Sequence, residues 1–201
     1  MNTDYSVEEK FLIKKDRVLS EVIKENGHIK FAVEKKEPFD TLVEIIISQF
    51  ISAKAAKSIK NKILNEFDEK KFYVNNFKNL SVVQIKDLGL SLNKAKSIKA
   101  VIEWLNIKSP IKTFFDLPQN EREKELLQIF GVGQWSVDMF EMFCIRNKNI
   151  FSYGDAALRE AMMQLEMVDK ESTQEEYEAY ANKWGPYKTQ ACLHLWEMIE
   201  S

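Results

Sequence analysis

The Gly-Val-Gly turn at residues 131–133 is the feature that most limits how this chain can fold. It lies in LLQIFGVGQWSVDMFEMFCIRNKNIFSYGDAAL, which runs from Leu126 to Leu158, and amphipathic segments flank it on both sides. Glycine adopts backbone angles that a residue with a Cβ resists, so the chain can reverse quickly there and leave helix amides exposed. Exposed amides and the helix dipole both favour an anion. The turn therefore predicts a helical hairpin able to seat a phosphate.

The rest of the chain has the pattern of a helical, globular protein. Of its 201 residues, 45% are hydrophobic, only four are proline, and no Val/Thr-rich alternating runs occur. These properties predict an all-α protein, either one domain or one compact unit in two lobes, over residues 1–201. No stretch approaches about 18 apolar residues, which argues against a membrane helix. The N-terminus, MNTDYSVEEK, is polar and acidic, which is wrong for a secretory signal.

Helix boundaries can be placed where capping residues adjoin periodic segments. Apolar residues repeat at helical spacing from about Ser6 to Asn26, and Gly27 closes that stripe. Ser52 precedes a second helical pattern as a candidate N-cap. Asp155 stands in the same position before AALREAM, which predicts that its side chain caps a helix beginning at residue 156.

The charge of the chain argues against a strongly basic nucleic-acid binder. Its formal net charge is −2, whereas a basic domain is the usual footprint of nucleic-acid binding. The acidic residues gather in a few runs, which leaves room for a separate basic face. The lysines expected on that face are Lys54, Lys57, Lys94, Lys96 and Lys188. We therefore expect weak non-specific binding with modest salt dependence.

Cysteine and histidine are too few to build the common metal centres. The two cysteines, Cys144 and Cys192, lie in apolar helical surroundings and are expected to be buried thiols. They cannot supply the four ligands of an iron–sulfur cluster. His28 and His194 are too far apart in sequence to suggest a metal site. His194 lies inside an apolar helix and is predicted to be a structural histidine with hydrogen-bond partners.

Four short segments of the chain form one combination of motifs. The first is G-V-G-Q-W with Asp155 twenty positions after Trp135, and the second is the helix pair around Gln49 and Phe50. The third is a Leu-Gly-Leu turn before a lysine-rich helix, and the fourth is W-G-P-Y-K followed by L-H-L-W. Together these segments resemble the helix-hairpin-helix DNA glycosylase superfamily, and within it the 3-methyladenine DNA glycosylase II group. The resemblance spans Phe11 to Trp196. We expect no β-rich N-terminal domain of the kind that longer members carry.

The resemblance implies an all-α, two-lobed fold with the hairpin at about 121–146 and a catalytic Asp loop at about 150–156. The implied activity is hydrolytic excision of alkylated purines, of the 3-methyladenine or 7-methylguanine type, from double-stranded DNA in base excision repair. It implies a cytoplasmic monomer, associated with the nucleoid if prokaryotic, that needs no organic cofactor. The alternatives are a glycosylase for another lesion, such as 8-oxoguanine, uracil or hypoxanthine, and a non-catalytic protein that binds lesions or junctions.

Asp155 is the catalytic residue that the resemblance implies. Cutting an N-glycosidic bond develops positive charge on the sugar, which a carboxylate stabilises while it orients or deprotonates the attacking water. The alternative is that Asp155 only caps its helix. Glycosylases that also nick the strand use a hairpin Lys, and here that position is Trp135. The resemblance therefore implies a monofunctional enzyme that leaves an abasic site.

Aromatic side chains are implied for the base pocket. The family counterparts of Trp135 and Trp196 line this pocket, where electron-rich rings attract a cationic alkylated purine. The alternative is that both tryptophans belong to the core. Met139 and Ala156 stand at positions that are aromatic in well-known members. We therefore expect Met139 to border a roomier or differently selective pocket.

The remaining implied contacts are with the DNA backbone and the base stack. Gln49 precedes Phe50, which the resemblance implies is a wedge that fills the hole left by an extruded nucleotide. The alternative is a core position for Phe50, because three isoleucines come shortly before it. Further DNA contacts are implied for Gly131, Gly133, Gln134 and Lys188. A monovalent cation is implied at the backbone carbonyls of Leu127, Ile129 and Val132. Lys94, Lys96 and Lys99 either form a solvated helix face or contact phosphates.

Overall fold

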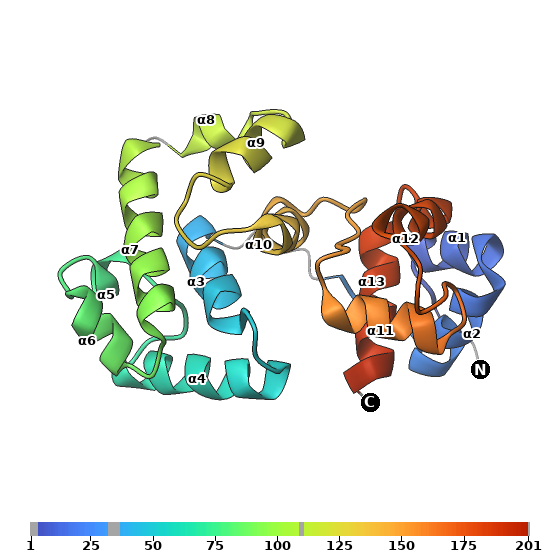
Figure 1. Ribbon diagram of the computed structural model, residues 1–201, viewed down its shortest axis with the longest axis horizontal. Helices are drawn as coiled ribbons and strands as arrows, with labels where there is room; N and C mark the ends of the chain where they lie inside the picture. Colours follow the sequence, from blue (N-terminus) through green and yellow to red (C-terminus); the bar gives the residue numbers. More distant parts are fainter. Residues whose placement is uncertain (1–3, 32–36, 109–110, 201) are drawn as a thin grey trace. The chain divides into compact units, whose positions relative to one another are not determined.

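The computed structural model describes residues 4–31, 37–108 and 111–200, and throughout these ranges the regular structure is helical, without a β-strand (Figure 1). The chain divides into two compact units. Unit 1 combines residues 1–34 with residues 146–201, and unit 2 comprises residues 35–145. The predicted all-α, two-lobed fold is confirmed. Within the described ranges, no helix is both long and apolar enough to cross a membrane.

Unit 1 is built around the last helix of the chain. Its helices are α1 (Val7–Lys15), α2 (Arg17–Asn26), α11 (Ala156–Gln164), α12 (Gln174–Ala181), a 3₁₀ turn η2 (Asn182–Trp184) and α13 (Lys188–Glu200). α13 packs against α1, α2 and α11, so it is the common neighbour of the first and later parts of the chain. The buried side chains of Leu19, Ile23 and Leu195 contribute to the core of this unit.

The single helical stripe predicted from Ser6 to Asn26 is divided in the structure. α1 ends at Lys15, and the Asp16 carboxylate caps α2 by accepting hydrogen bonds from the Val18 and Leu19 amides at 3.0 and 3.1 Å. Asp16 also accepts a hydrogen bond from the Trp184 indole at 2.8 Å. This tertiary contact stabilises the break between α1 and α2 at Asp16, which apolar spacing alone does not reveal. Gly27 ends α2 as predicted.

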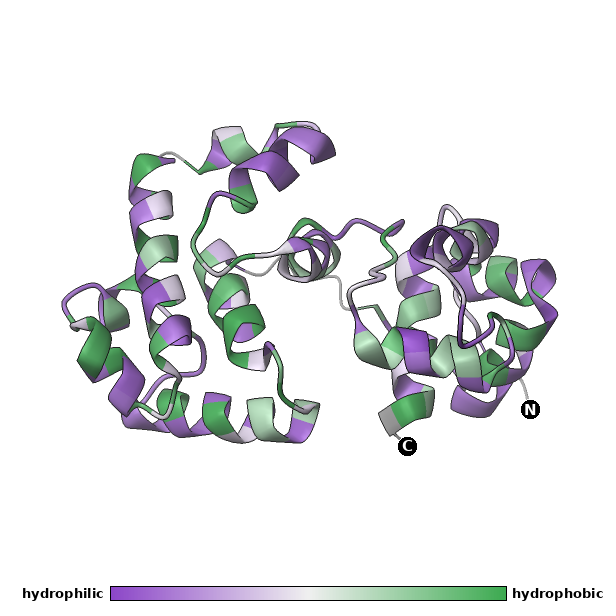
Figure 2. Ribbon diagram, viewed as in Figure 1, coloured by the Kyte–Doolittle hydropathy of each residue, from purple (hydrophilic) through white to green (hydrophobic). Residues whose placement is uncertain are grey.

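Unit 2 surrounds the apolar helix α3 (Pro38–Ser48), which packs against α4, α7 and α10. Figure 2 shows α3 as mainly hydrophobic and α9 as mainly hydrophilic. The other elements of this unit are α4 (Ala53–Glu66), α5 (Val74–Phe77), α6 (Val82–Asp87), α7 (Leu92–Ile107), α8 (Lys112–Phe115), α9 (Gln119–Leu126), α10 (Gln134–Phe140) and a π-helical turn η1 (Glu141–Ile145). Ser52 caps α4 by accepting a hydrogen bond from the Ala55 amide at 3.3 Å, as predicted.

A buried ion pair ties the two sides of the hairpin together. Arg122 of α9 donates to both carboxylate oxygens of Glu141 in η1, through Nε at 2.7 Å and through its terminal nitrogen Nη2 at 2.8 Å. Its other terminal nitrogen donates to the Leu117 carbonyl. This two-point contact is the geometry in which a guanidinium and a carboxylate bind most strongly. The hairpin is therefore fastened by a directional contact as well as by apolar packing.

Candidate functional site

Asp155 lies at the start of α11 in unit 1, where two donors hold one of its carboxylate oxygens. Oδ1 accepts a hydrogen bond from the Leu158 amide at 3.0 Å and another from the Trp196 indole nitrogen at 3.1 Å. The first contact confirms the predicted N-cap. The second joins Asp155 to a half-buried tryptophan of α13. The carboxylate therefore has a defined orientation rather than rotating freely at a helix end.

The loop before Asp155 is fastened to the beginning of α13 by Thr189, which is fully buried. The Ile150 amide donates to the Thr189 hydroxyl oxygen at 3.2 Å, and that hydroxyl donates to the Asn147 carbonyl at 2.8 Å. The Thr189 amide also donates to the Lys148 carbonyl at 3.0 Å. α13 thus supports Asp155 twice, through Thr189 at its first turn and through Trp196 near its end. Sequence reasoning missed Thr189, which no motif marks.

In unit 2, Gln49 joins the end of α3 to the hairpin. Its side-chain nitrogen donates to the Gly131 carbonyl and to the Ser136 hydroxyl, both at 2.9 Å. The structure therefore brings Gln49 together with two parts of the predicted hairpin. A DNA contact by Gln49 stays a prediction, and its observed role is to position the Gly-Val-Gly turn.

Phe50 follows immediately and is completely exposed, with a backbone φ of 59°. The alternative core position for this residue is therefore wrong. Glycine, which has no Cβ, would adopt this left-handed backbone conformation more readily than phenylalanine does. An exposed aromatic ring on strained backbone has no packing explanation within unit 2, and the wedge role stays a prediction.

The two glycines of the hairpin are needed for different reasons. Gly131 has φ 80°, and an added Cβ would lie 1.9 Å from the Ser97 hydroxyl oxygen of α7. Gly133 has φ −108°, and nothing lies within 4 Å of a Cβ added there. The fold itself therefore requires Gly131 but leaves the space beside Gly133 open. Gln134, the next residue, is exposed and donates to the Asp138 carboxylate at 2.9 Å.

Trp135 and Met139 lie four residues apart on α10, which places them on one side of that helix. Trp135 is half-buried, whereas Met139 is buried. Trp135 is thus neither a fully buried core residue nor a freely exposed one. The pocket role of both residues stays a prediction.

Two of the three lysines considered on α7 donate to backbone carbonyls near the ends of other helices. Lys94 donates to the Ile47 carbonyl near the end of α3 at 2.8 Å, and Lys99 donates to the Lys78 carbonyl beyond α5 at 3.0 Å. Burial lowers the pKa of the Lys94 ammonium below its ordinary value. Lys96 is exposed. Lys188, at the start of α13, donates to the Asn182 side chain at 2.6 Å.

The three carbonyls predicted to hold a cation belong to the hairpin turn. The Ile129 carbonyl accepts a hydrogen bond from the Val132 amide at 3.0 Å. A carbonyl oxygen carries a second lone pair that this bond does not use. Cation binding at Leu127, Ile129 and Val132 stays a prediction.

Comparison with known proteins relates the whole chain to DNA repair enzymes. The sequence model of the HhH-GPD superfamily base excision DNA repair proteins matches residues 43–187. DNA-3-methyladenine glycosylase 1 of Schizosaccharomyces pombe is 26% identical over 169 residues, which cover 83% of this chain and 74% of that protein. An alkylbase DNA glycosidase-like protein of the same yeast is 25% identical over 202 residues, covering 98% and 95%.

Solved structures give the same relation. The DNA-3-methyladenine glycosidase of Bacillus halodurans has a TM-score of 0.77 at 25% identity, covering 100% of this chain and 92% of that one. The 3-methyladenine DNA glycosylase of Schizosaccharomyces pombe, solved in complex with abasic DNA, has a TM-score of 0.86 at 23% identity and covers 98% of each chain.

Proposed function

This chain belongs to the HhH-GPD superfamily of base excision DNA repair proteins, and we propose that it is a DNA glycosylase for alkylated purines. The substrate is double-stranded DNA with a damaged base of the 3-methyladenine or 7-methylguanine type. The relatives named above are glycosylases for 3-methyladenine or alkylated bases, or proteins like them. The observation that carries the proposal is the Asp155 carboxylate, held by the Trp196 indole at 3.1 Å within this fold.

Asp155 is the catalytic residue of the proposed reaction. As the glycosidic bond breaks, positive charge develops on the sugar and negative charge on the departing base. A carboxylate beside the anomeric carbon stabilises the sugar and orients or deprotonates the attacking water. Oδ1 receives both donors described above, so the carboxylate is held in one orientation before substrate arrives. Such preorganisation lowers the cost of reaching the transition state.

Trp135 and Trp196 select the base in this proposal, and Met139 borders the pocket. Methylation at N3 or N7 leaves a cationic purine, and cation–π attraction then favours it over normal bases. A cationic base also leaves readily, so strong acid catalysis is unnecessary. Trp196 donates its indole N–H to Asp155, and in this proposal its ring stacks on the base.

The enzyme is proposed to be monofunctional. Strand cleavage by lyase-type members needs a hairpin lysine that forms a Schiff base with the sugar. Trp135 stands at that position and has no nucleophilic amine. The product is therefore a free base and an intact strand with an abasic site.

DNA contacts are proposed on unit 2 and at the start of α13. Phe50 wedges into the stack where the lesion leaves it. Gly133 and Gln134 contact the DNA backbone, and the open space beside Gly133 supports a close approach of the DNA. Lys188 supplies a further phosphate contact. The protein acts as a cytoplasmic monomer, with a monovalent cation at the hairpin carbonyls and no organic cofactor.

The proposal is tested by incubating the native protein with methylated DNA and identifying the released bases. We expect free 3-methyladenine and 7-methylguanine, with strand breaks appearing only after alkali. Breaks without alkali would contradict the monofunctional mechanism. Release only from oligonucleotides carrying 8-oxoguanine, uracil or hypoxanthine would reassign the substrate. Binding to lesion DNA without any release would show a non-catalytic binder.

A further inference from the structure

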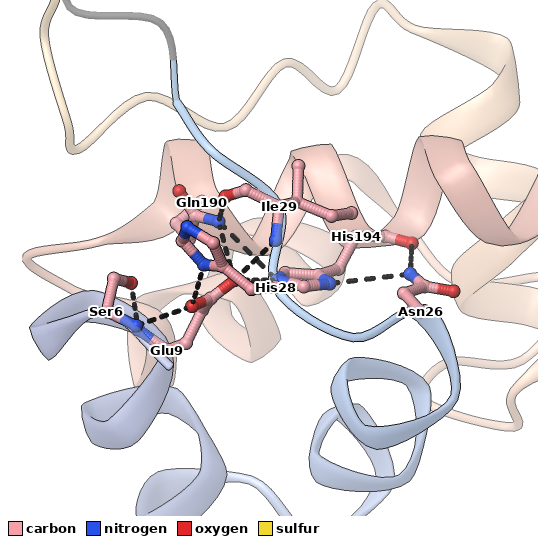
Figure 3. Close-up of polar contacts among 7 residues, drawn as sticks. All are labelled: Ser6, Glu9, Asn26, His28, Ile29, Gln190 and His194. Atoms are coloured by element: carbon pink, nitrogen blue, oxygen red, sulfur yellow. Dashed lines mark hydrogen bonds and ion pairs between the residues drawn. The ribbon is translucent and has the colours of Figure 1, made fainter. Parts of the chain in front are cut away.

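A buried polar cluster in unit 1 surrounds the Glu9 carboxylate, which the proposed reaction does not use (Figure 3). We call it the Glu9 cluster; its members are Ser6, Glu9, Asn26, His28, Ile29, Gln190 and His194. It joins α1, the end of α2 and the segment after it to α13. Glu9 and His194 are both fully buried. A buried carboxylate is costly unless hydrogen bonds compensate it, so its surroundings must be well ordered.

Donors converge on both oxygens of Glu9. Oε2 accepts from the Ser6 amide at 2.7 Å and contacts His28 Nδ1 at 2.8 Å. Oε1 accepts from the Ile29 amide at 2.8 Å and contacts His194 Nε2 at 3.1 Å. Burial on its own raises the pKa of this carboxyl, yet the hydrogen bonds from Ile29, His28 and Ser6 outweigh burial and lower the pKa below its ordinary value. Glu9 is therefore an ionised anchor at neutral pH.

The neighbours of His194 determine where its proton lies. The Asn26 side-chain nitrogen donates to the His194 backbone carbonyl at 2.8 Å and lies 3.4 Å from Nδ1 of the same residue. The Gln190 side-chain nitrogen lies equally far from Nε2, at 3.4 Å, so the two amide contacts do not decide between the tautomers. The ionised Glu9 carboxylate only accepts and lies closer to Nε2, at 3.1 Å, so the ring proton is on Nε2 and Nδ1 accepts from Asn26. Nε2 then donates to Glu9. Burial lowers the pKa of His194, with Glu9 opposing it, which keeps the ring neutral in this arrangement.

The same helix that carries this cluster also carries the donor to Asp155. Gln190 and His194 are four residues apart on α13 and share the side facing the N-terminal helices. Trp196 follows two residues later, about 200° further around the helix, and its indole contacts Asp155. Gln190 donates to the Ile29 carbonyl at 2.8 Å. One side of α13 is therefore anchored by directional bonds while the other orients the catalytic carboxylate.

We propose that Glu9 and His194 are positioning residues for Asp155, acting through the rotation and register of α13 that place Trp196. This role rests on the proposed glycosylase function of Asp155. Apolar contacts are not directional, so they permit small rotations of a helix. The hydrogen bond from His194 to Glu9 is directional and restricts the rotation of α13. A shift of about 1 Å in a catalytic group lowers a rate on the order of a hundredfold, so a modest rotation of α13 would be visible in catalysis.

The test compares His194→Leu, which removes the donor to Glu9, with His194→Gln, whose side-chain amide can still donate. The structural readout is the NMR signal of the Trp196 indole N–H, assigned with Trp196→Phe. The indole of Trp184 is the matched control, because it donates to the Asp16 carboxylate at 2.8 Å in the same unit but lies outside α13. Base release is measured in single turnover alongside DNA affinity.

We expect His194→Leu to move the Trp196 signal, leave the Trp184 signal in place and slow base release about ten- to a hundredfold without weakening DNA binding. His194→Gln should retain most of the native rate. An unchanged Trp196 signal, or both indoles moving together, would overturn the proposal. If His194→Leu does not fold, Glu9→Gln is measured in its place under the same criteria. The NMR result stands even if the native protein releases no base, so the two proposals fail separately.

Discussion

Phe50 separates folding from DNA recognition at the level of a single side chain. It is completely exposed and has φ 59°, so the folded protein gains little from its ring. We expect Phe50→Gly to change the free energy of unfolding by less than about 1 kcal/mol, because glycine relieves the left-handed backbone. Base release from duplex DNA should fall, while release from single-stranded DNA should not, since a wedge acts only in a stack. Equal losses on both substrates would contradict the wedge role.

Gly131 and Gly133 form a matched pair for the hairpin. Gly131→Ala places a Cβ 1.9 Å from the Ser97 hydroxyl oxygen on left-handed backbone, so we expect a loss of about 2 kcal/mol or more. Gly133→Ala meets nothing within 4 Å and should leave stability within about 0.5 kcal/mol of native. Urea unfolding measures both values. Gly133→Ala should still weaken DNA binding, and a variant that binds normally would contradict a close approach of DNA at this glycine.

Local sequence patterns predict the roles of some site residues, whereas roles that depend on contacts between distant residues cannot be predicted from them. The N-cap role of Asp155 was predictable because its partner, Leu158, is three residues away. The contact from Trp196 joins positions 41 residues apart, and Thr189 acts on Ile150 from 39 residues away. Periodicity carries no information about such pairs. The resemblance marked Trp196 as important but assigned it to the base pocket rather than to Asp155.

At the scale of elements, the Arg122–Glu141 pair is predicted to hold α9 against η1. Glu141→Gln leaves a charged guanidinium in a buried site, so we expect a loss of about 3–5 kcal/mol of unfolding free energy. The Lys108–Glu125 pair between α7 and α9 is the control, because both of its side chains are partly exposed. Glu125→Gln should cost about 1 kcal/mol or less. Similar losses in the two variants would show that the buried pair does not anchor the hairpin.

Element boundaries show where sequence patterns stop being informative. Ser52, Asp155 and Gly27 end or begin helices as predicted, because capping depends on residues within one turn. The break at Asp16 was missed, since it depends on the distant Trp184 indole. The sequence favours a solvated face or phosphate contacts for Lys94, Lys96 and Lys99, whereas in the structure Lys94 and Lys99 donate to carbonyls near the ends of other helices.

At the scale of the molecule, acid should weaken the fold through the Glu9 cluster. The pKa of His194 is lowered from 6.5 in the folded protein, so below about pH 6.5 the unfolded chain binds this proton first. The pKa of Glu9 is lowered from 4.5, which adds a further loss at more acidic pH. Stability is therefore full above the unfolded value of each group and falls as pH decreases.

The variant His194→Gln isolates the first of these contributions, because glutamine does not titrate. We expect the free energy of urea unfolding to fall less between about pH 7.5 and about pH 5.5 in this variant than in the native protein. The measurement is a urea titration at both pH values. The same pH dependence in both proteins would show that His194 does not gain its proton on unfolding.

The overall fold was predictable because helical spacing and four family-like segments agreed over nearly the whole chain. The pairing of the two chain segments that form unit 1 was not predictable from the sequence. Residues 1–34 pack with residues 146–201, and the contact from His194 to Glu9 joins positions 185 apart. Sequence patterns predicted that His194 was structural, which is confirmed, but they could not name its partner. The joining of two distant segments by α13 emerges only in three dimensions.

The central claim is that Asp155 is the catalytic carboxylate, and the most direct measurement is the single-turnover rate of base release by Asp155→Asn. Asparagine also caps helices, so this variant should fold and bind lesion DNA normally. Asp138→Asn is the control, because Asp138 and Asp155 are both 9% exposed. We predict a loss of about a hundred- to ten-thousandfold for Asp155→Asn and a near-native rate for Asp138→Asn. Native release by Asp155→Asn would contradict the account.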